Sequence, residues 1–274
     1  MISRKAFLSK FDNKKDKLLE LIKQEKVILL NKVASILDVS YMTAKKYVSF
    51  LEDEKLVSLV NGVIVYNAGT IQNAAYNYSV ISAEKIHRAE KESIGKRAAS
   101  LISDNDSIIL DTGSTCSFIA QNLPNNIKLT ILCYTLNTLM HVWNRANSTI
   151  VFAGGYFHKN SKMFESSEAI SLINRSRATK AFIAASGVSL DLGITCENNY
   201  EFSTKRAVIN SAQQKILVAD SFKFGLVRSV YFAKISEFDM IITDSGIPDE
   251  YREYFAENNI PMIICKDPVS EAVS

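Results

Sequence analysis

The chain has 274 residues, 47% of them hydrophobic and 22% charged, with a formal net charge of +3. These values indicate a globular protein of one large domain or two ordinary ones, and they exclude a disordered or fibrous chain. No apolar run reaches the length of a signal peptide core or a membrane span, so we expect a cytoplasmic protein without a membrane partner. The four cysteines lie far apart and no histidine stands at ligand spacing from them. We therefore expect reduced, buried thiols and no metal or cofactor.

The positive charge is concentrated at the N-terminus. Residues 1–60 hold twelve Lys or Arg and eight Asp or Glu, a net charge of +4, whereas the remainder holds 20 basic and 21 acidic residues, a net charge of −1. Such an asymmetry favours a nucleic-acid partner for the N-terminal part.

The first sixty residues predict a helix-turn-helix. A first helix is expected over residues 13–24, and a second short helix directs Val33, Ile36 and Leu37 inward. Ser40 follows as the N-cap of a third helix over 41–54, whose apolar positions Ala44, Val48 and Leu51 share one face. The outer face of the third helix then carries Tyr41, Met42, Lys45, Lys46 and Ser49. This arrangement offers the third helix to the major groove of DNA.

A β-hairpin is expected directly after these helices. The runs 56–60 and 63–66 are strand-like and are separated only by Asn61-Gly62, which suits a type I′ turn. Three helices and a hairpin make a winged helix. Winged helices also bind proteins, but the Lys45-Lys46 pair and the local charge favour DNA.

The run 39–52 resembles the DeoR-type helix-turn-helix of bacterial sugar-metabolism regulators. Lys45 and Lys46 match two arginines of that pattern and Thr43 matches its threonine, which implies that these three meet DNA. Tyr47 stands where the family has Asp, and Lys55 stands where Gly is common. Lysine lacks the fork with which arginine reads guanine, so the operator is expected to differ from the family norm. The candidate DNA-binding set is Ser40, Tyr41, Met42, Thr43, Lys45, Lys46 and Ser49.

A polar stretch over 67–82 is expected to be a linker, followed by one charged helix over 83–102. Its apolar stripe comprises Ile86, Ala89, Ile94, Ala98 and Leu101. A solvated face explains most of the charges on this helix.

From residue 107 onward, expected strands and helices alternate, which predicts an α/β domain with a mainly parallel sheet. The strands are expected at 107–110, 129–132, 149–153, 181–184, 216–219, 240–243 and 262–264. Helices are expected at 136–144, 167–174, 200–211 and 249–258, among others.

Residues 107–123 predict a strand, a turn and a helix that together favour an anion. Gly113 allows the tight turn, and Ser114 or Thr115 is expected to cap the helix that follows. Exposed N–H groups and the positive end of the helix dipole would attract a phosphate there. A plain β-to-α turn with a capped helix explains the same residues.

Ligands of open parallel sheets bind at the carboxyl ends of the strands, where polar and glycine residues collect in this chain. N–H groups and Lys223 suit a phosphate, and carboxylates, Asp244 among them, suit sugar hydroxyls. The candidate ligand-binding set is Asp111, Thr112, Gly113, Ser114, Thr115, Tyr134, Gly154, Gly155, Gly187, Asp220 and Lys223.

This part also resembles the sugar-phosphate-sensing domain of the DeoR family. The loop 111–115 matches that family's Asp-Ser-Gly-Thr-Thr, and Gly154-Gly155, Gly187, 193–195, 220–225 and 241–244 match further marks. The resemblance implies a fold similar to ribose-5-phosphate isomerase without its catalysis, and a homo-oligomer, a dimer or a tetramer. Cys133-Tyr134 replaces a usual Thr-Asn pair, and Ser166 appears where glycine is expected, so the ligand or its sensing is expected to be atypical.

We expect a winged helix-turn-helix DNA-binding domain over 1–67, a linker and connecting helix over 68–103, and a sensor domain over 104–274. The leading hypothesis is a repressor of a carbohydrate operon that binds operator DNA and a phosphorylated sugar effector. One alternative is a sugar-phosphate isomerase-like enzyme carrying a DNA-binding domain, with Asp111, Asp220 or Asp244 as base and Lys223 stabilising an enediolate. Another is a winged-helix scaffold that binds protein.

Overall fold

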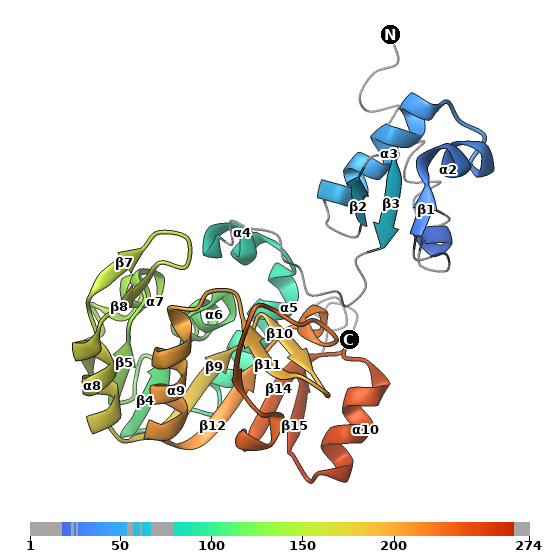
Figure 1. Ribbon diagram of the computed structural model, residues 1–274. Helices are drawn as coiled ribbons and strands as arrows, with labels where there is room; N and C mark the ends of the chain where they lie inside the picture. Colours follow the sequence, from blue (N-terminus) through green and yellow to red (C-terminus); the bar gives the residue numbers. More distant parts are fainter. Residues whose placement is uncertain are drawn as a thin grey trace. The chain divides into compact units, whose positions relative to one another are not determined.

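A computed structural model of the chain describes residues 18–22, 25, 27–53, 57–60, 62–66 and 79–265 (Figure 1). The chain forms two compact units, Met1–Thr70 and Ile71–Ser274, and each is considered by itself.

The N-terminal unit combines helices with a three-stranded antiparallel sheet. Its elements are β1 (Val27–Leu29), α2 (Leu30–Ile36), α3 (Tyr41–Asp53), β2 (Val57–Val60) and β3 (Val63–Tyr66), and residues 18–22 before them are helical. The strand order is β1-β3-β2. One small core, which includes Leu18, Ile22, Val33 and Leu51, holds these elements together.

The hairpin is confirmed, and two local expectations need correction. Val60 pairs with Val63, so the strands join through two residues, of which Gly62 has φ +78°. Ile36 was expected to point inward, but its side chain is 40% exposed. Ala34, beside Val33, is buried in its place. Residues 27–29, expected only as a lead into the second helix, form strand β1, which pairs with β3. Residues 13–17, 23 and 24 of the expected first helix lie outside the described residues.

The single helix expected over 83–102 is wrong, because the structure has two helices there, α4 (Val80–Lys85) and α5 (Arg88–Ala99). His87 adopts a left-handed conformation with φ +51°, which no helix continues through. The Nζ of Lys91 donates hydrogen bonds to the carbonyls of Ala83 and Ile86, at 2.8 and 2.7 Å. This lysine therefore satisfies carbonyl groups that the break in the helix leaves without helical partners.

The larger unit is built on a seven-stranded sheet whose pairs are all parallel, as the strand pattern predicts. Its order is β15-β14-β12-β9-β4-β5-β6. The strands are β4 (Asp106–Leu110), β5 (Leu129–Cys133), β6 (Ser148–Phe152), β9 (Ala178–Ala184), β12 (Ala212–Val218), β14 (Met240–Asp244) and β15 (Met262–Cys265). Each of the seven expected strands corresponds to one of them.

Helices cover both faces of this sheet and produce three layers (Figure 1). One face packs against α5, α6 (Ser114–Gln121) and α7 (Leu136–Val142). The other packs against α8 (Ser167–Arg175), α9 (Glu201–Ser211) and α10 (Asp249–Glu257). The four cysteines are buried and unpaired, as expected.

Short elements beyond the main sheet were not expected from the sequence. A small antiparallel sheet joins β10 (Gly187–Ser189), β11 (Gly193–Cys196) and β13 (Val230–Ala233), and a hairpin joins β7 (Tyr156–His158) to β8 (Met163–Glu165). Two 3-10 turns, η1 (Ser221–Lys223) and η2 (Ile235–Glu237), follow strands β12 and β13. Within the described part of the chain, no helix has the length and apolar character needed to cross a membrane.

Gly95 lets α5 approach α6 closely, and we predict that a side chain there is destabilising. A Cβ at this position would lie 2.6 Å from the Cβ of Phe118 and 2.7 Å from its carbonyl carbon. Overpacking of this kind costs about 1–3 kcal/mol, so Gly95→Ala should lower the free energy of unfolding by that amount in calorimetry. Ala89→Ser, on an exposed position of the same helix, is the matched control. Equal melting temperatures for the two variants would contradict this account of the α5–α6 contact.

Candidate functional site

The carboxyl ends of the parallel strands meet at one edge of the large sheet, and most predicted ligand residues lie there. Asp111 follows β4, Tyr134 follows β5, Gly154 follows β6 and Asp220 follows β12. The order of the strands places β5 and β9 on either side of β4, so the loops after these three strands are direct neighbours.

Asp111 is fully buried, and both of its carboxylate oxygens are occupied by protein groups. One oxygen accepts a hydrogen bond from the Tyr134 hydroxyl. The other accepts from the backbone N–H of Ala184 at 3.0 Å and from the Nζ of Lys205 at 2.6 Å. Asp111 therefore binds together the ends of β4, β5 and β9 and the helix α9.

Lys205 and Glu201 complete this buried cluster. Lys205 is 2% exposed, and its Nζ also donates to the carbonyl of Ala184 at 2.9 Å and lies 4.0 Å from Glu201. Burial by itself lowers the pKa of Lys205, but Asp111 and Glu201 outweigh burial and the pKa is raised. The lysine is therefore a cation inside the protein, held by two carboxyl groups.

Tyr134, one of the predicted ligand-binding residues, lies inside the protein. Its side chain has no exposed surface and packs in the core beside Leu132 and Met163. Burial, and then the negative charge of Asp111, raise the pKa of its hydroxyl, which is therefore a neutral donor. Asp111 was expected to bind sugar hydroxyls, yet in this structure both residues contact protein groups and fix the loops after β4 and β5.

The N-terminus of α6 has the geometry of an anion site without the expected side-chain cap. Gly113 precedes the helix with φ +132°, and a Cβ there would lie 2.9 Å from the Cβ of Ala184. Neither Ser114 nor Thr115 caps the helix, because the N-cap position is Gly113, which has no side chain. The first-turn N–H groups therefore have no side-chain partner. The buried hydroxyl of Thr112 also lacks a hydrogen-bond partner.

Gly154 and Gly155 lie at the end of β6 and contact the β7–β8 hairpin. Gly155 has φ +148°, and a Cβ there would lie 2.3 Å from the carbonyl oxygen of Glu165. Ser166, the departure noted in the sequence, donates to the carbonyl of Gly154 and accepts from the N–H of Ala169, both at 3.0 Å. Ser166 thus caps α8 and fixes the turn beside a hollow of about 520 Å³ that the two glycines line.

Asp220 faces a second buried lysine. The Lys91 Nζ lies 3.6 Å from its carboxylate, and neither of the two carboxylate oxygens has a hydrogen-bond partner. Burial lowers the pKa of Lys91 to about 8, against the opposing effect of Asp220. Burial also lowers the pKa of His87, with Lys91 and Lys223 acting in the same direction and Asp220 opposing them. These charges therefore cluster beside the β12 loop.

Asp244 holds that loop in place. It accepts hydrogen bonds from the N–H of Ser221 at 2.6 Å and of Gly246 at 3.2 Å. Lys223 is partly exposed at the end of η1. These residues place Lys223 at the sheet edge that also carries the α6 N-terminus.

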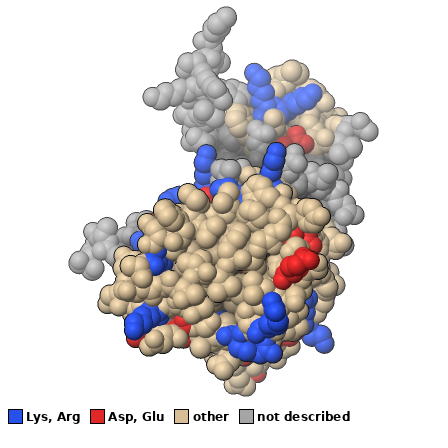
Figure 2. Space-filling model, turned by 90° about the vertical axis from the view of Figure 1, so that its left-hand side faces the viewer, with Lys and Arg blue, Asp and Glu red and all other residues tan. Residues whose placement is uncertain are grey.

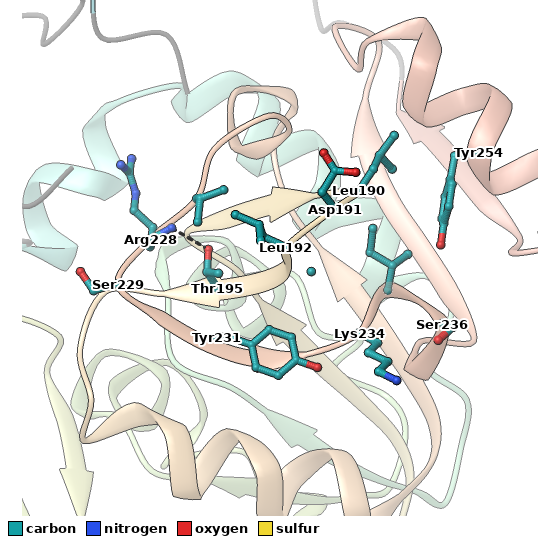
Figure 3. Close-up of a pocket in the computed structure, with 13 residues that line it drawn as sticks. Leu190, Asp191, Leu192, Thr195, Arg228, Ser229, Tyr231, Lys234, Ser236 and Tyr254 are labelled. Atoms are coloured by element: carbon teal, nitrogen blue, oxygen red, sulfur yellow. Dashed lines mark hydrogen bonds between the residues drawn. The ribbon is translucent and has the colours of Figure 1, made fainter. Parts of the chain in front are cut away.

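Gly187 is the first residue of β10 in the small sheet. A Cβ there would lie 2.4 Å from the carbonyl oxygen of Leu226, so the glycine serves a close backbone contact. A hollow of about 620 Å³ is formed over this sheet by Asp191, Tyr231, Lys234 and Tyr254, among others (Figure 3). None of the predicted ligand residues lines it. Among the described residues, no group of three or more His, Cys, Asp or Glu side chains is placed to hold a metal ion.

The sequence interpretation missed Lys91, Lys205 and Glu201. A signal was present, because Glu201 and Lys205 stand four residues apart on the helical face that also carries Val208. Charges at inward positions of an amphipathic helix indicate a buried pair. Their partner Asp111 lies 94 residues earlier in the chain than Lys205, and no local pattern could have named it.

In the N-terminal unit, α3 presents the predicted outer face. Ala44, Val48 and Leu51 are buried, and Tyr47 joins them. Ser40 is confirmed as the N-cap, since its Oγ accepts from the N–H of Thr43 at 3.2 Å. The remaining predicted DNA contacts on the helix are exposed, namely Tyr41, Met42, Lys45, Lys46 and Ser49, and Thr43 is half-buried. Each expected DNA-binding side chain thus lies at the start of α3 or on its outer side.

We predict that removing Lys205 alone is far more destabilising than removing its charge together with that of Asp111. Lys205→Met leaves a buried carboxylate without its cation, which costs about 3–5 kcal/mol. The double variant Asp111→Asn with Lys205→Met should recover much of that loss in urea unfolding. Lys215→Met breaks a partly exposed pair with Asp239 and, as the control, should cost less than about 1 kcal/mol. Additive effects of the Asp111 and Lys205 substitutions would contradict the pairing.

Comparison with known proteins places the chain in a family. Its residues 86–245 match the DeoR C terminal sensor domain. It is 28% identical over 247 residues to the deoxyribose operon repressor of Escherichia coli K12, covering 90% of this chain and 95% of that protein. It is 27% identical to the HTH-type transcriptional repressor GlcR of Bacillus subtilis, covering 90% and 93%.

Among solved structures, ribose 5 phosphate isomerase A from Neisseria gonorrhoeae is similar over 49% of this chain and 52% of that one, with 15% identity and a TM-score of 0.37. The family match itself spans more than half of the chain. The chain belongs to the DeoR family of transcriptional regulators.

Proposed function

We propose that the protein is a cytoplasmic repressor of a carbohydrate operon that binds operator DNA through residues 1–67 and is controlled by a phosphorylated sugar bound in residues 104–274. The observation that carries the proposal is the uncapped N-terminus of α6 behind Gly113, in a chain of a family of transcriptional regulators. Residues 68–103 would connect the two parts.

The outer side of α3 supports the DNA-binding half of the proposal. Lys45 and Lys46 are exposed on the same helix as Tyr41 and Met42, which are 49% and 62% exposed. Two adjacent cations would contact phosphates, and the larger side chains would reach base edges in the major groove. The relatives named above are themselves described as repressors.

The sheet edge supports the effector half. The N–H groups of Ser114 and Thr115, at the positive end of the α6 dipole, would bind a phosphate. The unpartnered Thr112 hydroxyl and the Lys223 ammonium would add to that site. Gly113 keeps the backbone open for a close approach, which a side chain at φ +132° would prevent.

Lys91 supports a route by which a bound effector would be sensed. It contacts Asp220 at the sheet edge and donates to the carbonyls at the end of α4. Since α4 lies within the connecting residues 68–103, a ligand that draws on Asp220 or Lys223 would change contacts of the connecting part. Control requires different affinities for two arrangements of the protein, a coupling of about 1–3 kcal/mol.

An isomerase-like enzyme is less well supported. Of its three candidate bases, Asp111 is held by Tyr134 and Lys205, and Asp244 is held by two backbone N–H groups. A base in catalysis needs a free lone pair within reach of the substrate proton. Asp220, the third candidate, is fully buried beside Lys91.

For DNA binding, we predict a steep decrease in affinity for the chain's own upstream DNA as salt increases. Lys46→Ala should weaken binding to all sequences and reduce the slope of log affinity against log salt by about 1. Lys128→Ala removes an exposed cation from the other unit and is the matched control. Fluorescence anisotropy at several salt concentrations measures both effects, and binding that is independent of salt would contradict the proposal.

For the effector, we predict that phosphorylated pentoses or hexoses raise the melting temperature and the unphosphorylated sugars do not. Bound ligand at 100 times its Kd stabilises by about 2.7 kcal/mol. Ser114→Pro should weaken that ligand by about ten- to a hundredfold, because proline at the first helical position keeps the helix but removes an N–H that would meet the phosphate.

Ser114→Ala keeps the N–H group and is the matched control, and Thr115→Ala tests the neighbouring hydroxyl. The melting temperature without ligand shows whether each variant folds. An unchanged affinity of the detected sugar phosphate in folded Ser114→Pro would place the phosphate elsewhere.

A further inference from the structure

One segment of the larger unit is nearly free of charge. Among the thirty residues 129–158, Arg145 is the single Asp, Glu, Lys or Arg, whereas such residues make up 22% of the whole chain. The guanidinium of Arg145 donates to the carbonyls of Leu123 and Pro124 and to the side chain of Asn125. The surface made by this segment therefore lacks the charges that normally solvate a protein.

The same segment exposes large apolar side chains at helical spacing. Leu136, Met140 and Trp143, at and just beyond the ends of α7, are separated by four and three residues and lie on one side of the helix. They are 36%, 62% and 64% exposed. The helix α7 already packs one apolar face on the sheet, through Leu139 and Val142. An additional, exposed apolar stripe on another side of the helix indicates a contact with another molecule.

The β7–β8 hairpin lies beside the start of α7 and continues this surface. The N–H of Leu136 donates to the carbonyl of Lys162 at 2.8 Å, and Thr135 forms a β-bridge with Met163. Strand β7 adds Tyr156, 79% exposed, and Phe157, 43% exposed. Figure 2 shows this side of the molecule, and most of the described surface that it turns to the viewer carries no Asp, Glu, Lys or Arg.

We propose that the surface formed by Leu136, Met140, Trp143, Tyr156 and Phe157, here the α7–β7 face, binds the same face of a second copy of this chain. In a two-fold interface each patch faces itself, so like charges would meet. The five side chains of the α7–β7 face carry no charge and avoid that repulsion, and the charged Lys159 and Lys162 of the adjoining hairpin are not part of it. These five side chains expose on the order of 600 Å², most of the about 800 Å² per partner that a standard interface buries.

This inference deepens the proposed function, because a repressor that binds a two-fold operator acts as a dimer. It requires neither the effector nor DNA. The full chain is therefore tested in buffer alone. A negative result for the dimer contact leaves the DNA and effector experiments unaffected, and negative results in those experiments leave the dimer test unaffected.

Trp143 is the one tryptophan of the chain and reports directly on the interface. On dilution from a concentration at which sedimentation shows a dimer, its emission should shift to longer wavelengths and its quenching by acrylamide should increase several-fold. A wild-type chain that sediments as a monomer at all concentrations would overturn the proposal. So would a dimer in which Trp143 is quenched as readily as in the monomer.

Variants then locate the contact. Met140→Glu places two like charges across the two-fold and should raise the dimer dissociation constant at least tenfold in sedimentation velocity. Leu192→Glu is the matched control, since Leu192 is 54% exposed in the β10–β11 turn. Its dimer should persist, and the melting curve of each variant shows that it folds. An intact dimer in folded Met140→Glu, or equal weakening by both variants, would overturn the assignment of the α7–β7 face.

Discussion

The buried contact between Asp111 and Lys205 is the interaction on which the sheet edge depends. A carboxylate with no exposed surface is stable only when its lone pairs are satisfied, and here Lys205, Tyr134 and the N–H of Ala184 satisfy them. Because these partners come from α9 and from the ends of β5 and β9, one side chain fixes the relative positions of four elements. The turn at Gly113 begins two residues later and takes its position from this cluster.

A second buried lysine provides the corresponding constraint at the β12 loop. Lys91 donates to the carbonyls of Ala83 and Ile86 at the helix break and also faces Asp220 in the loop after β12. One side chain therefore stabilises both the irregular backbone between α4 and α5 and that loop. Its ammonium has a pKa near 8 because burial outweighs the carboxylate. The Lys91 Nζ lies 3.6 Å from the Asp220 carboxylate, beyond hydrogen-bond range, whereas the Lys205 Nζ lies 2.6 Å from Asp111, so a ligand could compete for Asp220 more easily. That difference suits the proposed effector site, in which the turn at Gly113 is held firmly and the loop after β12 can change its contacts.

The α7–β7 face and the sheet edge share the segment 129–158. This segment supplies β5, whose apolar side chains are buried in the core, the edge strand β6, whose apolar side chains are partly buried against it, and the exposed stripe on α7. Tyr134 and Leu136 stand two residues apart, the first bound to Asp111 and the second on the outer surface. A change at the sheet edge after β5 would therefore reach the proposed dimer contact through a very short stretch of chain.

The sequence by itself determined the parallel sheet, the hairpin and the outward face of α3, because hydrophobic periodicity and local turn chemistry act over a few residues. All seven strands of the large sheet, the turn at Gly62 and the cap by Ser40 follow from such local patterns. Only the tertiary structure decided that Asp111 accepts hydrogen bonds from Tyr134 and Lys205. It also decided that the helix expected over 83–102 breaks at His87 and that Ser166 caps α8. These outcomes depend on partners far apart in the chain, and burial gives a charged or polar side chain a role that its sequence neighbours do not reveal.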